Sequence, residues 1–316
     1  MEGTTPTAGE RPLVLLGQPL FPEFAAALAG RFRFVLVEDA DAATLAEGRA
    51  LLIGLKPVTD DHLAALPALG LVAGISVGIN HVDLAACRRR GIAVTNAGEA
   101  FGVDTADYGV GLVVAVLRRL AAAEAHIWAG RWATDGDYPL TTKVSGKRVG
   151  IVGLGNIGSR IARRLAAFGC VVSYNSRSPK PSVPYEFVPT VRDLASGSDV
   201  LVLCCALTEE TKHVVNREVM EALGKDGVLV NVGRGGLVDE PELVRCLREG
   251  VIGGAGLDVF ESEPDVPPEL FSMDNVVLSA HRAVATPESI RDVIELVAGN
   301  LDAFFAGKPL LSPVQL

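Results

Sequence analysis

The sequence has few cysteines, no excess of positive charge and no long apolar run. Its five cysteines are odd in number and show no C-x-x-C spacing, so we expect neither a disulfide framework nor a metal site. The same observation predicts that the protein is in a reducing compartment. No apolar stretch approaches the ~20 residues that a membrane-spanning helix needs. The net charge of −9 argues against nucleic acid or an anionic membrane as a partner.

Neither end of the sequence carries a recognisable targeting signal. Met1 to Arg11 contain two glutamates and no apolar core, so we expect neither a signal peptide nor a transit peptide. The last residues, Pro313 to Leu316, differ from the S-K-L peroxisomal signal. These observations predict a cytoplasmic protein that binds no membrane.

The pattern of apolar runs predicts an α/β fold. Hydrophobic residues make up 49% of the chain, which is enough to bury a large core, and 316 residues suit two domains. Short apolar runs alternate with amphipathic segments in two series, with predicted strands at 13–16, 34–37, 51–55, 71–75 and 92–94, and then at 149–152, 171–174, 200–204, 228–232, 256–259 and 276–278. We therefore predict two doubly wound, Rossmann-like parallel sheets with a cleft between them.

The helices predict how the chain is shared between the two domains. Predicted helices lie at 23–29, 59–65, 83–90, 104–128 and 287–305, and a polar, aromatic loop follows at 130–139. The last helix comes after the second series of strands and is expected to return to the first domain. This predicts one domain of residues 1–101 and 285–316, and a second of residues 102–284.

A glycine motif opens the second series. Gly153, Gly155, Asn156, Ile157 and Gly158 form a G-x-G-x-x-G turn between a predicted strand and a predicted helix. In a dinucleotide site the first glycine permits the turn, the second admits the pyrophosphate, the third lets helix and strand pack, and the first helical N–H groups bind the anion. A turn that binds nothing is the alternative, but the flanking strand and helix favour a nucleotide.

The end of the next strand indicates which nucleotide binds. An NAD-selective site usually has Asp or Glu there, about twenty residues past the first glycines. This chain has Ser176, Arg177 and Ser178 instead, and a guanidinium can bind a 2′-phosphate through charge-assisted hydrogen bonds. A solvated basic loop is the alternative. The position at the strand end favours NADPH as the cofactor.

Three ionisable residues follow strands of the second series. Arg234, Glu263 and His281 are all expected at the carboxyl edge of the sheet, where this architecture binds ligands. Each has a structural alternative: a helix-cap salt bridge for Arg234, a solvated loop acid for Glu263 and a packing histidine for His281. Their common edge favours a catalytic site. His81 and His213 are expected to be surface or packing residues.

Together these motifs resemble the D-isomer-specific 2-hydroxyacid dehydrogenase family. The G-x-G-x-x-G, the N-x-x-R-G-x-x-V-D from Asn231, the D-V-F-x-x-E-P from Asp258 and the histidine after the next strand appear in the family's order. The segment from Ser76 to Asp83 is similar to the family's substrate loop. The basic segment from Asn175 to Ser178 is similar to that of the plant NADPH-dependent hydroxyphenylpyruvate and glyoxylate/hydroxypyruvate reductases.

The resemblance implies an activity and a role for each residue. The chain would reduce a 2-oxo acid (hydroxypyruvate, glyoxylate or 4-hydroxyphenylpyruvate) to a D-2-hydroxy acid with NADPH. Arg234 would bind the carboxylate and carbonyl oxygen of the substrate, His281 would give the proton, and Glu263 would favour the charged histidine. Asp258 would hold the nicotinamide carboxamide, and a strand-end cap is the structural alternative for it.

The first domain would then bind substrate and the second would bind NADP. The backbone amides of Val77 and Gly78 would add to the grip on the substrate carboxylate. Family members commonly pair, and the Ala/Leu/Val-rich segment with its aromatic loop predicts a homodimer through the region from Asp104 to Tyr138. A core helix in a monomer is the alternative there. A nucleotide-sensing, corepressor-like binding protein on the same fold is the alternative to an enzyme.

Overall fold

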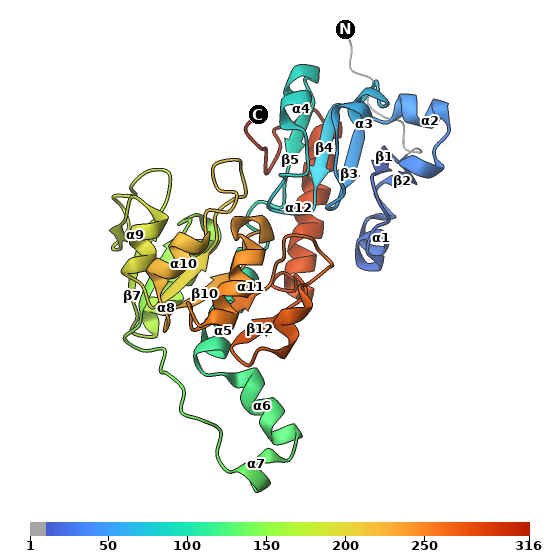
Figure 1. The fold of residues 1–316 in the computed structure, drawn as a ribbon. Coiled ribbons are helices and arrows are strands. Elements are labelled where there is room, and N and C mark those ends of the chain that lie inside the picture. Colours follow the sequence, from blue (N-terminus) through green and yellow to red (C-terminus); the bar gives the residue numbers. More distant parts are fainter. Residues whose placement is uncertain (1–10) are drawn as a thin grey trace. The chain divides into compact units, whose positions relative to one another are not determined.

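The computed structural model describes residues 11–316, which form two compact units. Unit 1 comprises the described chain up to Phe101 together with Thr286–Leu316, and unit 2 is Gly102–Ala285 (Figure 1). The expected absence of a signal or transit peptide concerns Met1 to Arg11, and all of these residues except Arg11 lie outside the described part of the chain. None of the helices in that part is both long and apolar enough to cross a membrane.

Unit 1 contains a five-stranded parallel sheet in the order β2-β1-β3-β4-β5. Its strands are β1 (Leu13–Leu16), β2 (Arg33–Leu36), β3 (Ala50–Ile53), β4 (Leu71–Gly74) and β5 (Ala93–Thr95). The inner strands β3 and β4 are buried along their whole length, as expected of parallel strands covered on both faces. The sequence predicted every one of these strands to within two residues.

Helices cover the sheet of unit 1: α1 (Pro22–Leu28), α2 (Ala42–Glu47), α3 (Asp60–Ala64), α4 (Leu84–Arg90) and α12 (Pro287–Phe305), with a 3-10 turn η1 (Val37–Asp39). The last helix, α12, packs against α1 and β4, and Arg31 forms an ion pair with Asp302. α12 therefore returns to the fold begun by the first hundred residues. The sequence analysis predicted α12 at its observed bounds but did not name α2.

Unit 2 contains a seven-stranded parallel sheet in the order β12-β11-β10-β9-β6-β7-β8. Its strands are β6 (Arg148–Val152), β7 (Val171–Asn175), β8 (Glu186–Phe187), β9 (Val200–Leu203), β10 (Val228–Asn231), β11 (Gly254–Leu257) and β12 (Val276–Leu278). The chain runs outward from β6 through β7 to β8 and then crosses to β9 on the other side. Ligands bind at such a switch point, between the carboxyl ends of β6 and β9. The predicted doubly wound α/β fold is confirmed.

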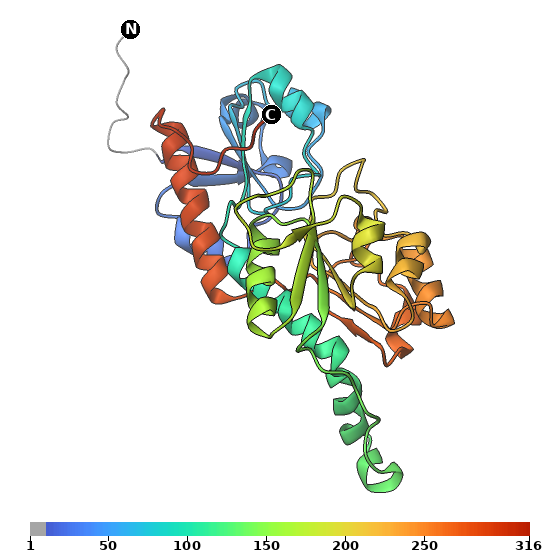
Figure 2. The same cartoon turned by 90° about the vertical axis from the view of Figure 1, so that its left-hand side faces the viewer.

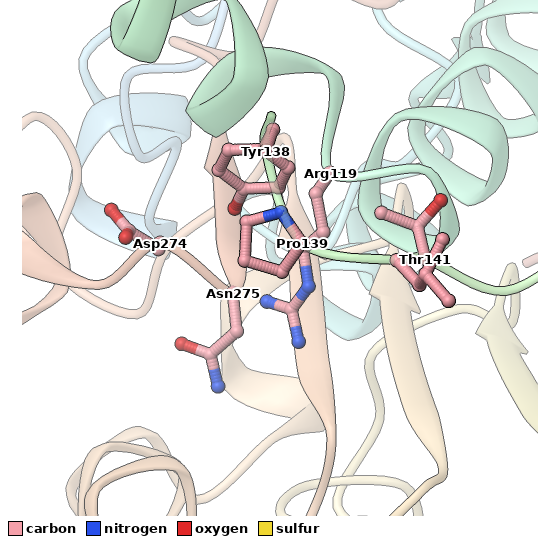
Figure 3. Close-up of a pocket in the computed structure, with 7 residues that line it drawn as sticks. Arg119, Tyr138, Pro139, Thr141, Asp274 and Asn275 are labelled. Atoms are coloured by element: carbon pink, nitrogen blue, oxygen red, sulfur yellow. The ribbon is translucent and has the colours of Figure 1, made fainter. Parts of the chain in front are cut away.

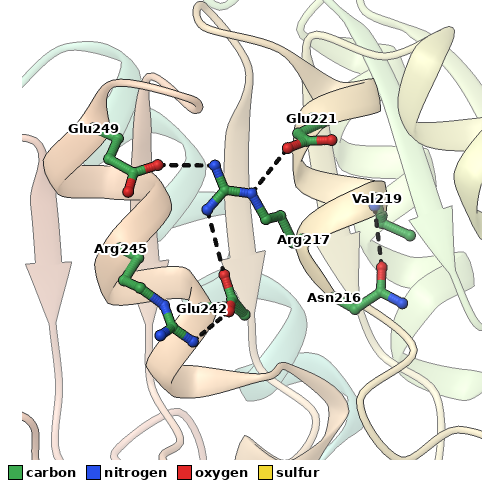
Figure 4. A network of polar contacts seen from close by, with 7 residues as sticks. All are labelled: Asn216, Arg217, Val219, Glu221, Glu242, Arg245 and Glu249. Carbon is green, nitrogen blue, oxygen red and sulfur yellow. Dashed lines mark hydrogen bonds and ion pairs between the residues drawn. The ribbon is translucent and has the colours of Figure 1, made fainter.

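The helices of unit 2 are α5 (Gly102–Leu117), α6 (Leu120–Trp128), α7 (Arg131–Asp135), α8 (Asn156–Ala167), α9 (Val191–Ser196), α10 (Arg217–Leu223) and α11 (Glu240–Glu249), with the 3-10 turns η2 (Gly235–Leu237) and η3 (Pro268–Ser272). α5 packs on α8, β10 and β11, and its apolar side chains belong to the core. An ion network links α10 to α11 (Figure 4). At its centre the Arg217 guanidinium lies 2.8 Å from Glu249 and 2.9 Å from Glu221.

The prediction of one continuous helix over 104–128 is wrong. The chain breaks between α5 and α6 because Arg119 adopts a left-handed conformation, with φ 50°. Its guanidinium Nη2 donates to the carbonyl of Gly253, 2.8 Å away, so a tertiary contact fixes the break. No glycine or proline marks the position in the sequence. The predicted loop at 130–139 likewise contains the short helix α7.

Residues 120–140 form an arm, which we define as α6, α7 and the chain that returns from them. Figures 1 and 2 show α6 and α7 extending beyond the sheet of unit 2. The arm is held together from within, because His126 Nε2 lies 2.9 Å from the carbonyl of Gly136 and Trp132 Nε1 donates to Asp137 over 2.9 Å. Five large apolar side chains on it are exposed: Leu120, Ile127, Trp128, Trp132 and Leu140.

An ion pair fixes the start of β6 beside the start of β9. Asp199 accepts hydrogen bonds from the Arg148 guanidinium (2.7 Å) and the Arg148 backbone N–H (2.8 Å). The Arg148 side chain thereby lowers the pKa of Asp199. A group with a lowered pKa stabilises the fold above its unfolded-state pKa and loses that contribution as the pH falls through its folded-state pKa.

We therefore expect Asp199→Asn to lower the free energy of unfolding by about 1 kcal/mol at neutral pH. The difference from the parent chain should shrink as the pH falls below about 4, where the carboxylate of the unfolded chain takes up a proton, and should vanish below the lowered pKa of the folded chain. Urea titrations at several pH values measure both effects. Asp226→Asn removes the same charge from an exposed turn and should leave stability unchanged. A loss that is independent of pH would contradict the electrostatic origin.

Candidate functional site

The three glycines of the G-x-G-x-x-G turn differ in what lies next to each of them. Gly153 has φ +93°, and a Cβ there would lie 2.6 Å from the backbone nitrogen of Cys205. A Cβ on Gly158 would lie 2.1 Å from the carbonyl oxygen of Gly153, so helix α8 can approach β6 only with glycine at this position. Nothing lies within 4 Å of a Cβ built on Gly155, so a ligand can reach the backbone at this point.

The next two residues of the turn begin α8. Asn156 Oδ1 accepts a hydrogen bond from Arg160 Nε over 2.7 Å, and Ile157 packs against the core. Their side chains are therefore engaged within the unit, and the backbone N–H groups of the first helical turn are the donors available to an anion. The geometry matches the predicted dinucleotide fingerprint.

The chain after β7 carries the residues predicted to bind the 2′-phosphate of NADPH. Asn175 Nδ2 donates to the carbonyls of Val188 and Pro189, each 2.9 Å away, and Ser176 Oγ donates to the carbonyl of Ser178 over 2.7 Å. Arg177 is exposed, and within residues 11–316 no hydrogen bond or ion pair engages its guanidinium. The tip of β7 thus presents a cation with its donors directed to solvent.

Arg234 lies in a turn that is shaped by a buried asparagine at the end of β10. Asn231 Oδ1 accepts from the Gly233 N–H (3.0 Å), and its Nδ2 donates to the Arg234 carbonyl (2.9 Å). Gly235 brings this turn against Phe260, since a Cβ on Gly235 would overlap the Phe260 carbonyl carbon at 1.9 Å. Burial lowers the pKa of Arg234, and the charge of Glu263 offsets part of that effect.

Glu263 and His281 form a hydrogen-bonded pair. Glu263 Oε2 lies 2.8 Å from His281 Nδ1, and Glu263 Oε1 accepts from the Phe260 N–H at 3.0 Å. Burial by itself would raise the pKa of Glu263, but the hydrogen bonds from His281 and Phe260 and the charge of Arg234 lower it overall. His281 has φ 51°, and its N–H donates to the Asp258 carbonyl over 2.8 Å. The pair therefore holds an ionised carboxylate against one ring nitrogen and leaves Nε2 for another contact.

Asp258 is engaged inside the unit. Its side chain is 1% exposed, and its oxygens accept from Ser279 Oγ (2.6 Å), the Arg282 N–H (2.7 Å) and the Ala283 N–H (3.0 Å). These bonds fasten the segment that carries His281 to the end of β11. The arrangement favours the strand-end cap over a contact with nicotinamide.

A second histidine–carboxylate pair contains Glu261, which precedes Glu263 by two residues. His213 Nε2 is 2.8 Å from Glu261 Oε1, and His213 also has φ 51°. Its N–H donates to the Gly236 carbonyl over 2.8 Å. His213 therefore ties surface segments together, which agrees with the packing role predicted for it.

In unit 1, Val77 and Gly78 lie in the turn that follows β4. Ser76 Oγ donates to the Gly78 carbonyl (2.8 Å), and Asn96 Nδ2 donates to the Val77 carbonyl (2.9 Å). The bonds that hold this turn use its carbonyl oxygens, and none within residues 11–316 uses the N–H groups of Val77 and Gly78. The two amides are therefore able to donate to an anion.

The sequence analysis missed the two asparagines that shape these turns. Asn96 follows β5 and Asn231 ends β10, and each accepts from the N–H two residues ahead while its Nδ2 donates to a loop carbonyl. The available signal was an amide side chain at the end of an otherwise apolar strand, a position where Asn favours a turn over continuation.

One cavity of about 450 Å³ lies away from all of these residues (Figure 3). It is lined by Arg119, by residues 138–141 of the arm and its return, and by Asp274 and Asn275. Asn275 directly precedes β12 and Gly253, which binds Arg119, directly precedes β11. The cavity is thus at the amino ends of strands whose carboxyl ends lead to Asp258 and His281, so it is not the site of the predicted chemistry.

Comparison with known proteins identifies relatives of the whole chain. Residues 110–283 match the profile of the D-isomer specific 2-hydroxyacid dehydrogenase, NAD binding domain. A glyoxylate/hydroxypyruvate reductase of Arabidopsis thaliana is 56% identical over 98% of this chain and 99% of its own. A hydroxyphenylpyruvate reductase of Plectranthus scutellarioides is 53% identical over 79% of this chain and 80% of its own. The predicted resemblance is confirmed.

Solved structures agree with these relatives. An NADPH-dependent glyoxylate/hydroxypyruvate reductase from Sinorhizobium meliloti, in complex with NADP and malonate, has a TM-score of 0.90 and 38% identity, covering 96% of this chain and 97% of its own. A 2-hydroxyacid dehydrogenase from Ketogulonicigenium vulgare also has a TM-score of 0.90, with 39% identity, covering 98% of this chain and 99% of its own. The nucleotide-sensing alternative finds no support among these proteins.

Proposed function

We propose that this chain, which belongs to the D-isomer specific 2-hydroxyacid dehydrogenase family, reduces hydroxypyruvate, glyoxylate or 4-hydroxyphenylpyruvate with NADPH. The products are the corresponding D-2-hydroxy acids. The observation that carries the proposal is the Glu263–His281 pair beside Arg234, with 2.8 Å between Glu263 Oε2 and His281 Nδ1. An acid, its partner and a forked cation are the groups that protonation of an oriented oxo acid requires.

The residues of unit 2 fit NADPH, and we assign this unit as the NADP-binding domain. Gly155 gives a phosphate access to the backbone at the start of α8, and the exposed Arg177 can pair with a 2′-phosphate. The flanking Ser176 and Ser178 add hydroxyl groups, and no carboxylate stands at the end of β7 to repel the phosphate. NADPH, when bound, supplies the hydride.

Arg234 binds the oxo acid, and His281 protonates it. The planar guanidinium of Arg234 can hold the substrate carboxylate and carbonyl oxygen together, which fixes the face of the carbonyl that receives the hydride. His281 Nε2 then gives its proton to the carbonyl oxygen, and in the reverse direction the neutral imidazole accepts it. Glu263 holds Nδ1 and stabilises the charged imidazole. Asp258 positions the segment that carries His281.

Unit 1 is assigned as the substrate-binding domain. The N–H groups of Val77 and Gly78 donate to the substrate carboxylate, while Ser76 and Asn96 hold the carbonyl side of the same turn.

Loss of NADPH absorbance on addition of each of the three oxo acids tests the proposed function. We expect turnover with at least one acid, formation of the D isomer of the product, and slower turnover when NADH replaces NADPH. Binding of NADPH without turnover of any of the three would overturn the proposal and favour a nucleotide sensor.

We further propose that the chain is a homodimer paired through its arm. Most of the apolar side chains of α5 are buried in its own unit, although Val103 is exposed. The larger exposed apolar side chains lie on the arm, where Trp128 is 81% exposed and Trp132 is 61% exposed. Several large exposed apolar side chains on one segment are typical of an interface, and two-fold dimers are the commonest assembly.

We also propose that the protein is located in the cytoplasm. Its five cysteines show no paired spacing, which is typical of proteins in a reducing compartment.

Light scattering at micromolar concentration should give twice the 33.1 kDa mass of one chain. The double substitution Trp128→Glu and Leu140→Glu should give the mass of one chain, because charge in an apolar interface is not solvated. Phe21 is 56% exposed at the start of α1 in unit 1 and is not part of the arm, so Phe21→Glu is the matched control and should remain dimeric. A single-chain mass for the unmodified protein would refute the pairing.

A further inference from the structure

The end of the chain is bonded to the edge of the sheet in unit 1. We call residues 311–314 the tail. The Val314 N–H donates to the Val94 carbonyl (2.8 Å), and the Asn96 N–H donates to the Ser312 carbonyl (3.3 Å). Ser312 Oγ donates to the Asn96 carbonyl (2.7 Å). The tail therefore runs beside β5 and the residue that follows it.

A buried asparagine on α12 fixes the tail from its other side. Asn300 is 1% exposed. Its Oδ1 accepts from the Leu311 and Ser312 N–H groups (2.9 and 3.2 Å), and its Nδ2 donates to Ser312 Oγ (2.9 Å) and the Leu296 carbonyl (3.1 Å). An amide side chain offers two donors and two acceptors, so all four are used. Ser312 is thus held between Asn300 and Asn96.

The same bonds continue to the turn after β4. Asn96 Nδ2 donates to the Val77 carbonyl (2.9 Å), and the Ala97 N–H donates to the Ser76 carbonyl (2.9 Å). A continuous series of hydrogen bonds therefore leads from Asn300 through Ser312 and Asn96 to the turn that contains Val77. Because each peptide unit is planar, holding the Val77 carbonyl also fixes the orientation of the Gly78 N–H.

We propose that the tail is a positioning element for oxo-acid binding, with Ser312 as its central residue. It acts through Asn96 and sets the direction in which the Val77–Gly78 amides point. The proposal rests on the function assigned above, in which those amides bind the substrate carboxylate. Donors fixed before binding cost less ordering when the anion arrives, so loosening the tail should weaken substrate binding and leave cofactor binding intact.

Ser312→Ala tests the proposal because it removes the hydroxyl that joins Asn300 to Asn96 and leaves the backbone bonds of the tail. We expect the KM for the preferred oxo acid to rise about 3–10-fold, the value of one well-placed hydrogen bond. The turnover number and the Kd for NADPH should stay within about twofold, because neither depends on this turn. Ser312→Thr keeps the hydroxyl and should restore the KM. Gln315→Ala, at an exposed position beyond the tail, is the matched control.

Amide hydrogen exchange gives a second measurement that needs no turnover. Exchange at Ala97 and Gly98, whose N–H groups donate to the Ser76 carbonyl and to Asn96 Oδ1 and so report on this turn, should be faster in Ser312→Ala than in Gln315→Ala. Exchange across unit 2 should be equal in the two variants. If the oxo acids are not substrates but exchange rises at this turn, the positioning role stands and the proposed function fails. If Ser312→Ala only lowers the Tm, with KM and exchange at the turn unchanged, the tail is purely structural and this inference is wrong.

Discussion

Replacing His281 with alanine should lower the turnover number ~10²–10⁴-fold while NADPH still binds. The reason is that Glu263 Oε2 lies 2.8 Å from His281 Nδ1, which leaves Nε2 as the ring nitrogen that we propose to protonate the substrate oxygen. Single-turnover measurements with hydroxypyruvate, beside NADPH titration by fluorescence, separate loss of chemistry from loss of cofactor. A variant that keeps most of its activity would assign the proton to water or to another residue.

His213 provides a matched control for that experiment. It shares with His281 a 2.8 Å pair with a glutamate and a φ of 51°, but it ties surface segments together. His213→Ala should therefore keep its turnover number within about tenfold and lose some stability instead. Equal losses in the two variants would mean that removing either histidine disturbs the fold, and the specific role of His281 would then have no support.

Replacing Arg177 with alanine should raise the KM for NADPH at least ~10-fold and leave the KM for NADH nearly unchanged. The guanidinium is exposed at the tip of β7, and the only group that distinguishes the two cofactors is the 2′-phosphate. Initial rates with both cofactors at saturating oxo acid measure the ratio. Equal effects on NADPH and NADH would remove Arg177 from cofactor selection.

Two further variants sharpen the Arg177 experiment. Arg177→Lys keeps the charge but not the planar fork, so it should fall between the parent chain and Arg177→Ala. Arg163→Ala removes the same charge from an exposed position on α8 and should leave the preference for NADPH intact. A loss of preference in Arg163→Ala would point to the overall charge of the unit as the cause.

Much of the fold could be predicted because its strands are apolar and its turns carry glycine. β9 and β10 are buried along their whole length and stand out from the polar segments around them. The candidate site could be predicted for a related reason. Arg234 and His281 are polar residues just past such strands, and parallel strands bring their carboxyl ends to one edge of the sheet.

The features that the sequence analysis missed depend on tertiary contacts. Nothing at Arg119 signals the break between α5 and α6, which is fixed by a bond to the distant Gly253 carbonyl. For Asp258 the sequence analysis left two roles open, a contact with nicotinamide and a strand-end cap. The three donors from residues 279–283 that favour the cap surround Asp258 only in the folded chain. β8 is two residues long, too short for a periodic pattern.

The return of α12 to unit 1 has a consequence for biosynthesis. Unit 2 is a continuous segment and can complete its fold once Ala285 has left the ribosome. Unit 1 begins earlier in the chain but must wait for Val293, Val297 and Leu301, which α12 buries, and then for Ser312. Unit 1 begins before unit 2 but therefore finishes folding after it, and the sheet of unit 1 lacks part of its apolar cover until α12 has been translated.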